Sequence, residues 1–120
     1  MKAFWISLAL FLLVIGAVIA NAAYISYISD RLEEYSKSIQ YNKSPADLIE
    51  ELQDFWDKHR KFIGLSMETP EIDSVEKTIL SLKLSYEEGQ EFEFERCRLL
   101  LAKASREIKR LETFSIENIF

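Results

Sequence analysis

His59 is the only histidine of the chain and the side chain best suited to proton chemistry, because an imidazole titrates close to neutral pH. Trp56 lies three residues earlier, so a helix would place the two side chains next to each other on one face. The pair could line a pocket between helices that responds to pH or to a small ligand. The simpler interpretation, which we favour, is that His59 is an imidazole at the edge of the core with one satisfied hydrogen bond.

Other residues that could carry chemistry occur without the partners they would need. A single histidine excludes a histidine-rich metal site, and the residue three before it is Trp56 instead of the glutamate of a di-iron bundle motif. Glu88, Glu91 and Glu95 could share a helical face, but no calcium-loop pattern accompanies them. Motifs of serine, cysteine or phosphate-binding enzymes are missing as well. We therefore expect no catalytic residue, no metal and no cofactor, and we interpret the glutamates as a solvated helix face.

Cys97 is the only cysteine, so no disulfide can form within the chain. It falls on an apolar helical stripe, which predicts a small buried side chain in preference to a reactive thiol or an intermolecular disulfide. Cys97 and His59 could meet across helices, but no third residue that would orient them can be named.

The N-terminal segment must place everything that follows, because the eighteen residues from Ala3 to Ala20 carry no charge. At about 1.5 Å of rise per residue, a helix of this length approaches the hydrocarbon thickness of a bilayer, about 30 Å. We predict an uncleaved signal-anchor helix over residues 1–29. The alternative is secretion after cleavage following Ala22, since Ala20-Asn21-Ala22 fits a signal-peptide site, although the apolar run is long for one.

Charges beside this segment predict its orientation. Lys2 precedes it, whereas Asp30, Arg31, Glu33 and Glu34 follow it. Positive charge is favoured on the cytoplasmic side, so we expect a single-pass protein of the cell membrane with its N-terminus inside and residues 30–120 outside. The same side follows if the segment is cleaved.

The part of the chain after the apolar segment is strongly acidic. All 20 acidic residues lie at or after Asp30, against 14 basic residues there. This balance offers no electrostatic footprint for nucleic acid, so we expect no nucleic-acid partner. The excess is uneven, with a net charge of -9 from Asp30 to Glu95 and +3 from Arg96 to Phe120. The last helix should therefore dock on the acidic remainder, although exposed ion pairs contribute only about 0–1 kcal/mol each.

Apolar residues recur at steps of three and four and predict helices over about 24–41, 45–63, 70–86 and 91–113. Ser44-Pro45 and Thr69-Pro70 resemble helix starts, and Gly64 is placed to end a helix. A turn at Glu87–Gln90 is our choice over one long helix. The expected core positions are Ile25, Ile28, Leu32, Tyr35, Ile39, Leu48, Ile49, Leu52, Phe55, Trp56, His59, Phe62, Ile63, Ile72, Val75, Ile79, Leu80, Leu82, Leu84, Tyr86, Phe94, Cys97, Leu101, Ala104, Ile108 and Leu111.

These patterns predict an all-α protein whose N-terminal transmembrane helix continues into an antiparallel up-down-up-down helical bundle over residues 30–120. The apolar tail, residues 114–120, is expected to dock on the bundle. Pairing of the stripes between chains in a dimeric coiled coil is the alternative. Pro45 and Pro70 argue against it, because they divide the pattern into pieces with the length of bundle helices.

Three features together resemble an uncharacterised family of small bacterial membrane proteins, the domain of unknown function numbered 4363. They are a charged-tipped membrane helix followed by a helix with Trp56, the segment Glu71-Ile72-Asp73-Ser74-Val75-Glu76, and the ending Glu117-Asn118-Ile119-Phe120. The resemblance covers essentially the whole chain and implies a single-pass protein with an extracytoplasmic helical domain and no established activity. Where relatives often have a histidine before the Ile-Asp segment, this chain has Thr69-Pro70, so we transfer no functional residue.

The sequence thus favours a non-enzymatic, membrane-anchored module with a structural or protein-interaction role in the bacterial cell envelope. Its partners would be the membrane, another envelope or membrane protein, and possible further copies of the chain. The alternative function is a small-molecule or pH-sensing bundle that signals through a partner membrane protein, with Trp56 and His59 as the pocket residues.

Overall fold

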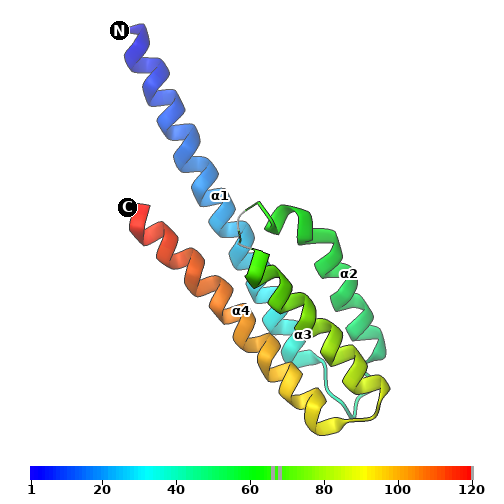
Figure 1. Ribbon diagram of the computed structural model, residues 1–120. Coiled ribbons are helices and arrows are strands. Elements are labelled where there is room, and N and C mark those ends of the chain that lie inside the picture. The colour runs from blue at the N-terminus through cyan, green and yellow to red at the C-terminus, as the bar shows by residue number, and fades with distance from the viewer. Residues whose placement is uncertain (66, 68, 120) are drawn as a thin grey trace.

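The first helix contains both the apolar N-terminal segment and the first set of residues buried in the core. In the computed structural model, α1 extends without interruption over Lys2–Ser38, 37 residues. The structure describes residues 1–65, 67 and 69–119, with the side chains up to residue 112. The most apolar 18-residue window of α1 has none of its residues buried, and the helix is long and apolar enough to cross a membrane. Its N-terminal half stands clear of the other helices (Figure 1).

Three further helices follow α1 among the described residues: α2 spans Ala46–Ile63, α3 spans Thr69–Glu87 and α4 spans Glu91–Ile119. The described residues contain no strand, so the all-α prediction is confirmed. The predicted break between the last two helices is confirmed as well, since α3 ends at Glu87 and α4 begins at Glu91. Together the helices form a narrow body with extents of 68 × 23 × 22 Å.

The core is one cluster to which all four helices contribute. α4 packs against α1 and α3, and α2 packs against α3 and α1 (Figure 1). Each helix presents a stripe of aliphatic and aromatic residues, because the steps of three and four in the sequence place them on one face. The fully buried large side chains include Trp56, Phe94, Ile25, Ile28, Leu32, Ile39, Leu52, Ile63, Leu82 and Leu101.

Four apolar residues expected in the core are instead partly or largely exposed. Phe62 is 62% exposed, and Leu80, Leu84 and Leu111 are at least a third exposed. On α2 the two predicted stripes are adjacent, and the buried face centres on Trp56 and the residues in line with it. Phe62 therefore falls outside the buried face, because six residues of helix rotate it well away from Trp56.

The ends of the helices also differ from the sequence prediction. α1 ends at Ser38, three residues before the predicted Tyr41. Ser44 does not cap α2 with its side chain; it has a positive φ of 45° and Pro45 is the residue before the helix. α4 continues as helix to Ile119, beyond the predicted end at Thr113, because no glycine or proline interrupts it. The predicted docking of the side chains of residues 114–120 lies outside the described side chains.

Gly89 is the one glycine that needs its conformational freedom, since its φ is +68° in the turn between α3 and α4. A Cβ there would meet only the Tyr41 hydroxyl, at an ordinary 3.7 Å, so the cost of a side chain lies in the backbone. We expect Gly89→Ala to lower the free energy of unfolding by about 1–2 kcal/mol. Chemical denaturation of the detergent-solubilised chain measures this change.

Gly64 provides the matched control for Gly89→Ala. It follows α2 with right-handed angles, φ -61° and ψ -18°, instead of the left-handed cap that glycine usually supplies. Gly64→Ala should therefore cost no more than a few tenths of a kcal/mol. Equal losses for the two substitutions would contradict the assignment of the Gly89 effect to its positive φ.

Candidate functional site

His59 lies in a cluster of aromatic side chains between α1 and α2, close to where α1 leaves the bundle. We call it the aromatic cluster: Tyr24, Tyr27, Tyr35, Phe55 and His59. The His59 ring lies 4.7 Å from that of Phe55 and 6.2 Å from that of Tyr27, measured between centroids. Its Nδ1 is 2.8 Å from the Tyr24 hydroxyl. The predicted core-edge imidazole with one hydrogen bond matches this position.

The surroundings of His59 favour its neutral form. Burial among the rings lowers the pKa of the imidazole, and the positive charge of Lys58 lowers this pKa further. A neutral imidazole accepts at one nitrogen, so the Tyr24 hydroxyl can donate to Nδ1 at 2.8 Å. Protonation would require the imidazole to donate there instead, and would place a charge among aromatic rings.

Arg31 and Glu51 complete the polar edge of the aromatic cluster. The Arg31 guanidinium carbon lies 4.9 Å from the centroid of the Tyr35 ring, within the range of a cation–π contact. The Tyr35 hydroxyl donates a hydrogen bond to Glu51 Oε1 at 3.0 Å. Burial raises the pKa of Tyr35, and the bond to Glu51 raises it further. The Tyr35–Glu51 bond joins α1 to α2, whereas the Arg31–Tyr35 contact lies within α1.

Trp56 points to a different helix from His59. Its indole Nε1 donates to Glu76 Oε1 on α3 at 3.3 Å, and Arg60 Nε pairs with the same oxygen at 2.5 Å. Trp56, Arg60 and Glu76 line a groove of about 220 Å³ between α2 and α3. His59 is not among the residues that line this groove. The pocket predicted for Trp56 and His59 together stays a prediction. The Trp56 indole N–H points to α3, whereas the His59 Nδ1 points to α1.

A larger groove of about 370 Å³ lies toward the other end of α2 and α3. Its lining includes three acidic side chains, one lysine and one aromatic ring. The lining residues are Ala46, Ile49, Glu50, Gln53, Asp54, Lys83, Tyr86 and Glu87. No group of three or more His, Cys, Asp or Glu residues that could hold a metal ion occurs in the described part of the chain.

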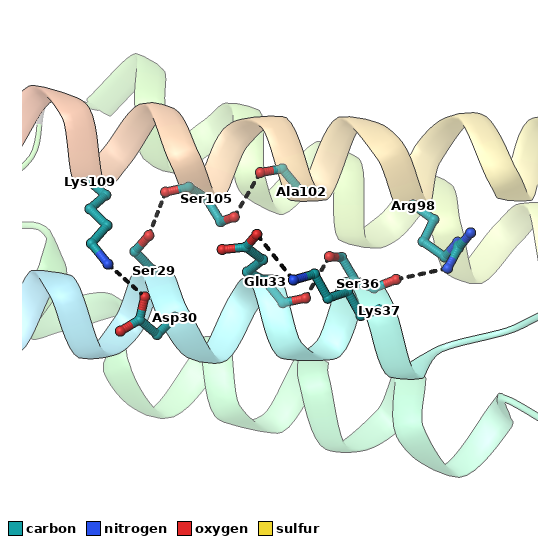
Figure 2. Close-up of polar contacts among 9 residues, drawn as sticks. All are labelled: Ser29, Asp30, Glu33, Ser36, Lys37, Arg98, Ala102, Ser105 and Lys109. Carbon is teal, nitrogen blue, oxygen red and sulfur yellow. Dashed lines mark hydrogen bonds and ion pairs between the residues drawn. The ribbon is translucent and has the colours of Figure 1, made fainter.

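Polar contacts also join α1 to α4, as Figure 2 shows. We call these contacts the α1–α4 seam. The buried Ser29 hydroxyl donates to the Ser105 carbonyl at 2.6 Å. Lys109 Nζ pairs with Asp30 Oδ1 at 3.0 Å, and Arg98 Nη1 donates to the carbonyl of Ser36 at 3.3 Å (Figure 2). Sequence reasoning anticipated a basic last helix against an acidic remainder, and the Lys109–Asp30 pair is of this kind.

Cys97 and Glu95, two other residues considered for chemistry from the sequence, make contacts that are ordinary in helix packing. Cys97 is buried, as predicted, and its sulfur lies 4.0 Å from the Ser85 hydroxyl on α3. His59 contacts α1, so the thiol and the imidazole face different helices. Glu95 pairs with Arg98 one turn later on its own helix. These contacts are typical of helix packing and of a solvated helix face.

Comparison with known proteins gives no relative from which a role could be transferred, since no family model, no curated protein and no solved structure matches the chain. The resemblance to the 4363 family stays a prediction from the residues that carry it.

Proposed function

We propose that this protein is held in the cell membrane by the first half of α1 and serves as a non-enzymatic structural or protein-interaction module of the cell envelope. The observation that carries the proposal is the continuity of α1. Its uncovered apolar half passes without a break into a half whose residues are buried in the bundle core. Any force on the bundle would therefore reach the membrane segment through one rigid helix.

The same proposal includes an antiparallel up-down-up-down bundle for the rest of the chain. It is supported by the order of the contacts: Ser29 meets Ser105 while Ser36 meets Arg98, so positions rise along α1 as they fall along α4. The α2 contacts to α1 follow the same rule, since Tyr24 meets His59 and Tyr35 meets Glu51. Short connections between successive helices agree with this topology.

A partner protein is part of the proposal because large apolar side chains remain in solvent on α3 and α4. Phe92 is 83% exposed and Leu99 is 64% exposed, and Leu80 and Leu84 are about half exposed. Exposed apolar groups of this size favour association with another envelope or membrane protein, or with a second copy of the chain.

In-cell crosslinking followed by pull-down from native membranes tests the interaction role. A photoreactive residue at Leu99 should give defined products with a second protein or a second copy. The same residue at Lys43, which is exposed in the loop before α2, is the control and should not. Recovery of the uncrosslinked chain alone from both positions would contradict the partner proposal.

We further propose that the N-terminus is inside and the bundle outside, following the charges that flank the apolar segment. A reporter that is active only outside the cytoplasm, fused after residue 120, should be active. Protease added to intact spheroplasts should degrade the bundle. Protection of the bundle would reverse this topology and leave the anchor itself unaffected.

A pH-sensing bundle that acts through a partner is the second candidate, and the His59–Tyr24 contact is the observation that favours it. Because burial and Lys58 lower the pKa of His59, the unfolded chain binds the proton more readily than the folded one. The stability due to neutral His59 is therefore fully present above the ordinary histidine pKa of about 6.5. It is lost as pH falls through that value toward the lower folded pKa.

Replacing His59 by Gln should remove this contribution and flatten the dependence of thermal stability on pH between about 7 and 5. Gln keeps a polar side chain of similar reach but does not titrate. Thermal unfolding followed by circular dichroism at a series of pH values gives the two profiles. Parallel slopes for the two proteins would eliminate His59 as a pH-responsive group.

A further inference from the structure

The end of α2 carries apolar side chains that the bundle does not cover. Phe62 is 62% exposed and Leu65, in the turn that follows, is 85% exposed. The turn is ordered by a hydrogen bond from the Leu65 amide to the Phe62 carbonyl at 3.2 Å. Two large apolar side chains exposed to water within four residues are unfavourable, which raises the question of what they contact.

The position of α2 along α1 answers this question. The His59–Tyr24 contact shows that His59 on α2 lies at about the same height along the α1 axis as Tyr24. Tyr24 is four residues, or about 6 Å along the axis, beyond Ala20, the last residue of the apolar stretch before the polar Asn21. α2 runs antiparallel to α1, toward its apolar half. Measured along the axis of α1, Phe62 is therefore about 4.5 Å closer to that half than His59 is. Phe62 thus reaches nearly the level of Ala20. Each headgroup layer is about 5–7 Å thick, so Phe62 and Leu65 fall at its depth.

The charges on the segment that carries these two residues suit the phosphates of such a layer. Residues 57–65 contain three basic side chains, Lys58, Arg60 and Lys61, and one acid, Asp57. Arg60 is paired with Glu76 across the groove to α3, whereas Lys58 and Lys61 are exposed. Exposed lysines beside an apolar side chain are typical of segments that lie at an anionic lipid surface.

We propose that residues 58–65 dock on the surface of the bilayer that α1 spans, with Phe62 and Leu65 among the lipids and Lys58 and Lys61 on the phosphates of anionic phospholipids. This inference rests on the proposed anchoring of α1. It adds a second membrane contact, which fixes the tilt of the bundle and of α1, joined as one rigid helix, relative to the plane of the bilayer.

Depth measurements on the full chain in vesicles test the docking. Cys97→Ala removes the native thiol, and a nitroxide is then attached to one new cysteine at a time: Phe62→Cys, Leu65→Cys, Phe92→Cys or Leu12→Cys. Phe92 is the matched control, because it is an exposed phenylalanine near the α3–α4 turn, at the opposite end of the bundle (Figure 1). Each label is compared for its accessibility to oxygen, which concentrates in lipid, and to a water-soluble nickel chelate.

In vesicles of phosphatidylcholine and phosphatidylglycerol, the oxygen-to-nickel ratio at positions 62 and 65 should exceed that at position 92 several-fold. Position 12 should give the highest ratio. Equal ratios at 62, 65 and 92, with position 12 still deep in the lipid, would overturn the docking and leave the anchor intact. A low ratio at position 12 would overturn the anchor, and the docking with it.

A second comparison tests the preference for anionic lipid. Adding phosphatidylglycerol to pure phosphatidylcholine should raise the ratio at position 65, and the double substitution Lys58→Gln and Lys61→Gln should abolish that rise. Lys37→Gln with Lys43→Gln, at exposed lysines near the start of α2 and thus at the opposite end of α2 from residues 58–65, is the control and should preserve it. No response to phosphatidylglycerol in the unsubstituted background would overturn the role of the two lysines.

Discussion

Replacing Phe94 by alanine is expected to lower the free energy of unfolding by about 3–5 kcal/mol, a large part of the 5–15 kcal/mol typical of a small domain. Phe94 is completely buried on α4. Its ring lies 5.4 Å from the centroid of Tyr41 and 6.1 Å from that of Tyr86. Truncation would remove both ring contacts and leave a cavity where the chain after α1, the end of α3 and the start of α4 meet.

Phe92 supplies the control for Phe94, since it is the same residue type two positions earlier and is 83% exposed. Phe92→Ala should change the free energy of unfolding by no more than about 0.5 kcal/mol. Both variants can be compared by thermal unfolding in the same detergent. Similar losses for Phe92→Ala and Phe94→Ala would contradict the orientation of α4 described here.

The sequence predicts the buried face of α1 well because a single stripe of apolar residues determines it. The residues expected on α1, Ile25, Ile28, Leu32, Tyr35 and Ile39, are all buried. The same argument fails on α2, where two adjacent stripes compete. Spacing alone does not say which of them is central, and the exposure of Phe62 is the result.

Helix ends are predicted less well because several local signals compete at each of them. Ser44-Pro45 has the composition of a capped start, yet Ser44 adopts a positive φ and its side chain does not cap α2. The apolar spacing predicts an end of α4 at Thr113, but no glycine or proline in residues 114–119 breaks the helix, and it continues to Ile119. Glycine gives a correct signal at both ends it was expected to mark. The turn at Gly89 requires φ +68°, and α2 ends at Ile63 with Gly64 directly after it, although Gly64 keeps right-handed angles.

The contacts of the candidate site were harder to predict than the fold. His59 was identified from its chemistry, but its partner Tyr24 is 35 residues away and becomes a neighbour only through the packing of α2 on α1. The same is true of Glu76, which receives the Trp56 indole proton on α3. Such pairs depend on the relative level of two helices, which apolar periodicity does not fix to within one turn.

The α1–α4 seam and one further contact show how far α4 packs along α1. Ser29 contacts the α4 backbone, while Asp30 contacts the Lys109 side chain one turn further along α4 (Figure 2). Residue 112 of α4 reaches Asn21, since Asn21 Nδ2 donates to Glu112 Oε1 at 3.2 Å. The contacts of α4 with α1 therefore extend as far as Asn21, the residue directly after the apolar stretch Ala3–Ala20. A shift of α1 along its axis would have to break contacts along this whole length.

The apolar half of α1 gives the second large expected effect. Leu12→Arg together with Leu13→Arg places two charges near the centre of the Ala3–Ala20 run. Each arginine at the centre of a spanning helix costs about 2.5–3.5 kcal/mol on insertion scales, and the favourable term of each leucine is lost as well. The double variant should move from the membrane pellet to the supernatant after alkaline carbonate extraction, whereas Leu12→Ile with Leu13→Ile should remain in the pellet.

The stability of the bundle should not change in the arginine variant, because Leu12 and Leu13 are exposed on the part of α1 that the other helices leave uncovered. The arginine variant in detergent should therefore unfold at the same temperature as the unsubstituted chain, which separates loss of the anchor from loss of the fold. Mass spectrometry of the unsubstituted protein decides the remaining alternative. An intact N-terminal segment agrees with the anchor, and a chain that begins at Ala23 and is recovered in the supernatant would establish secretion after cleavage.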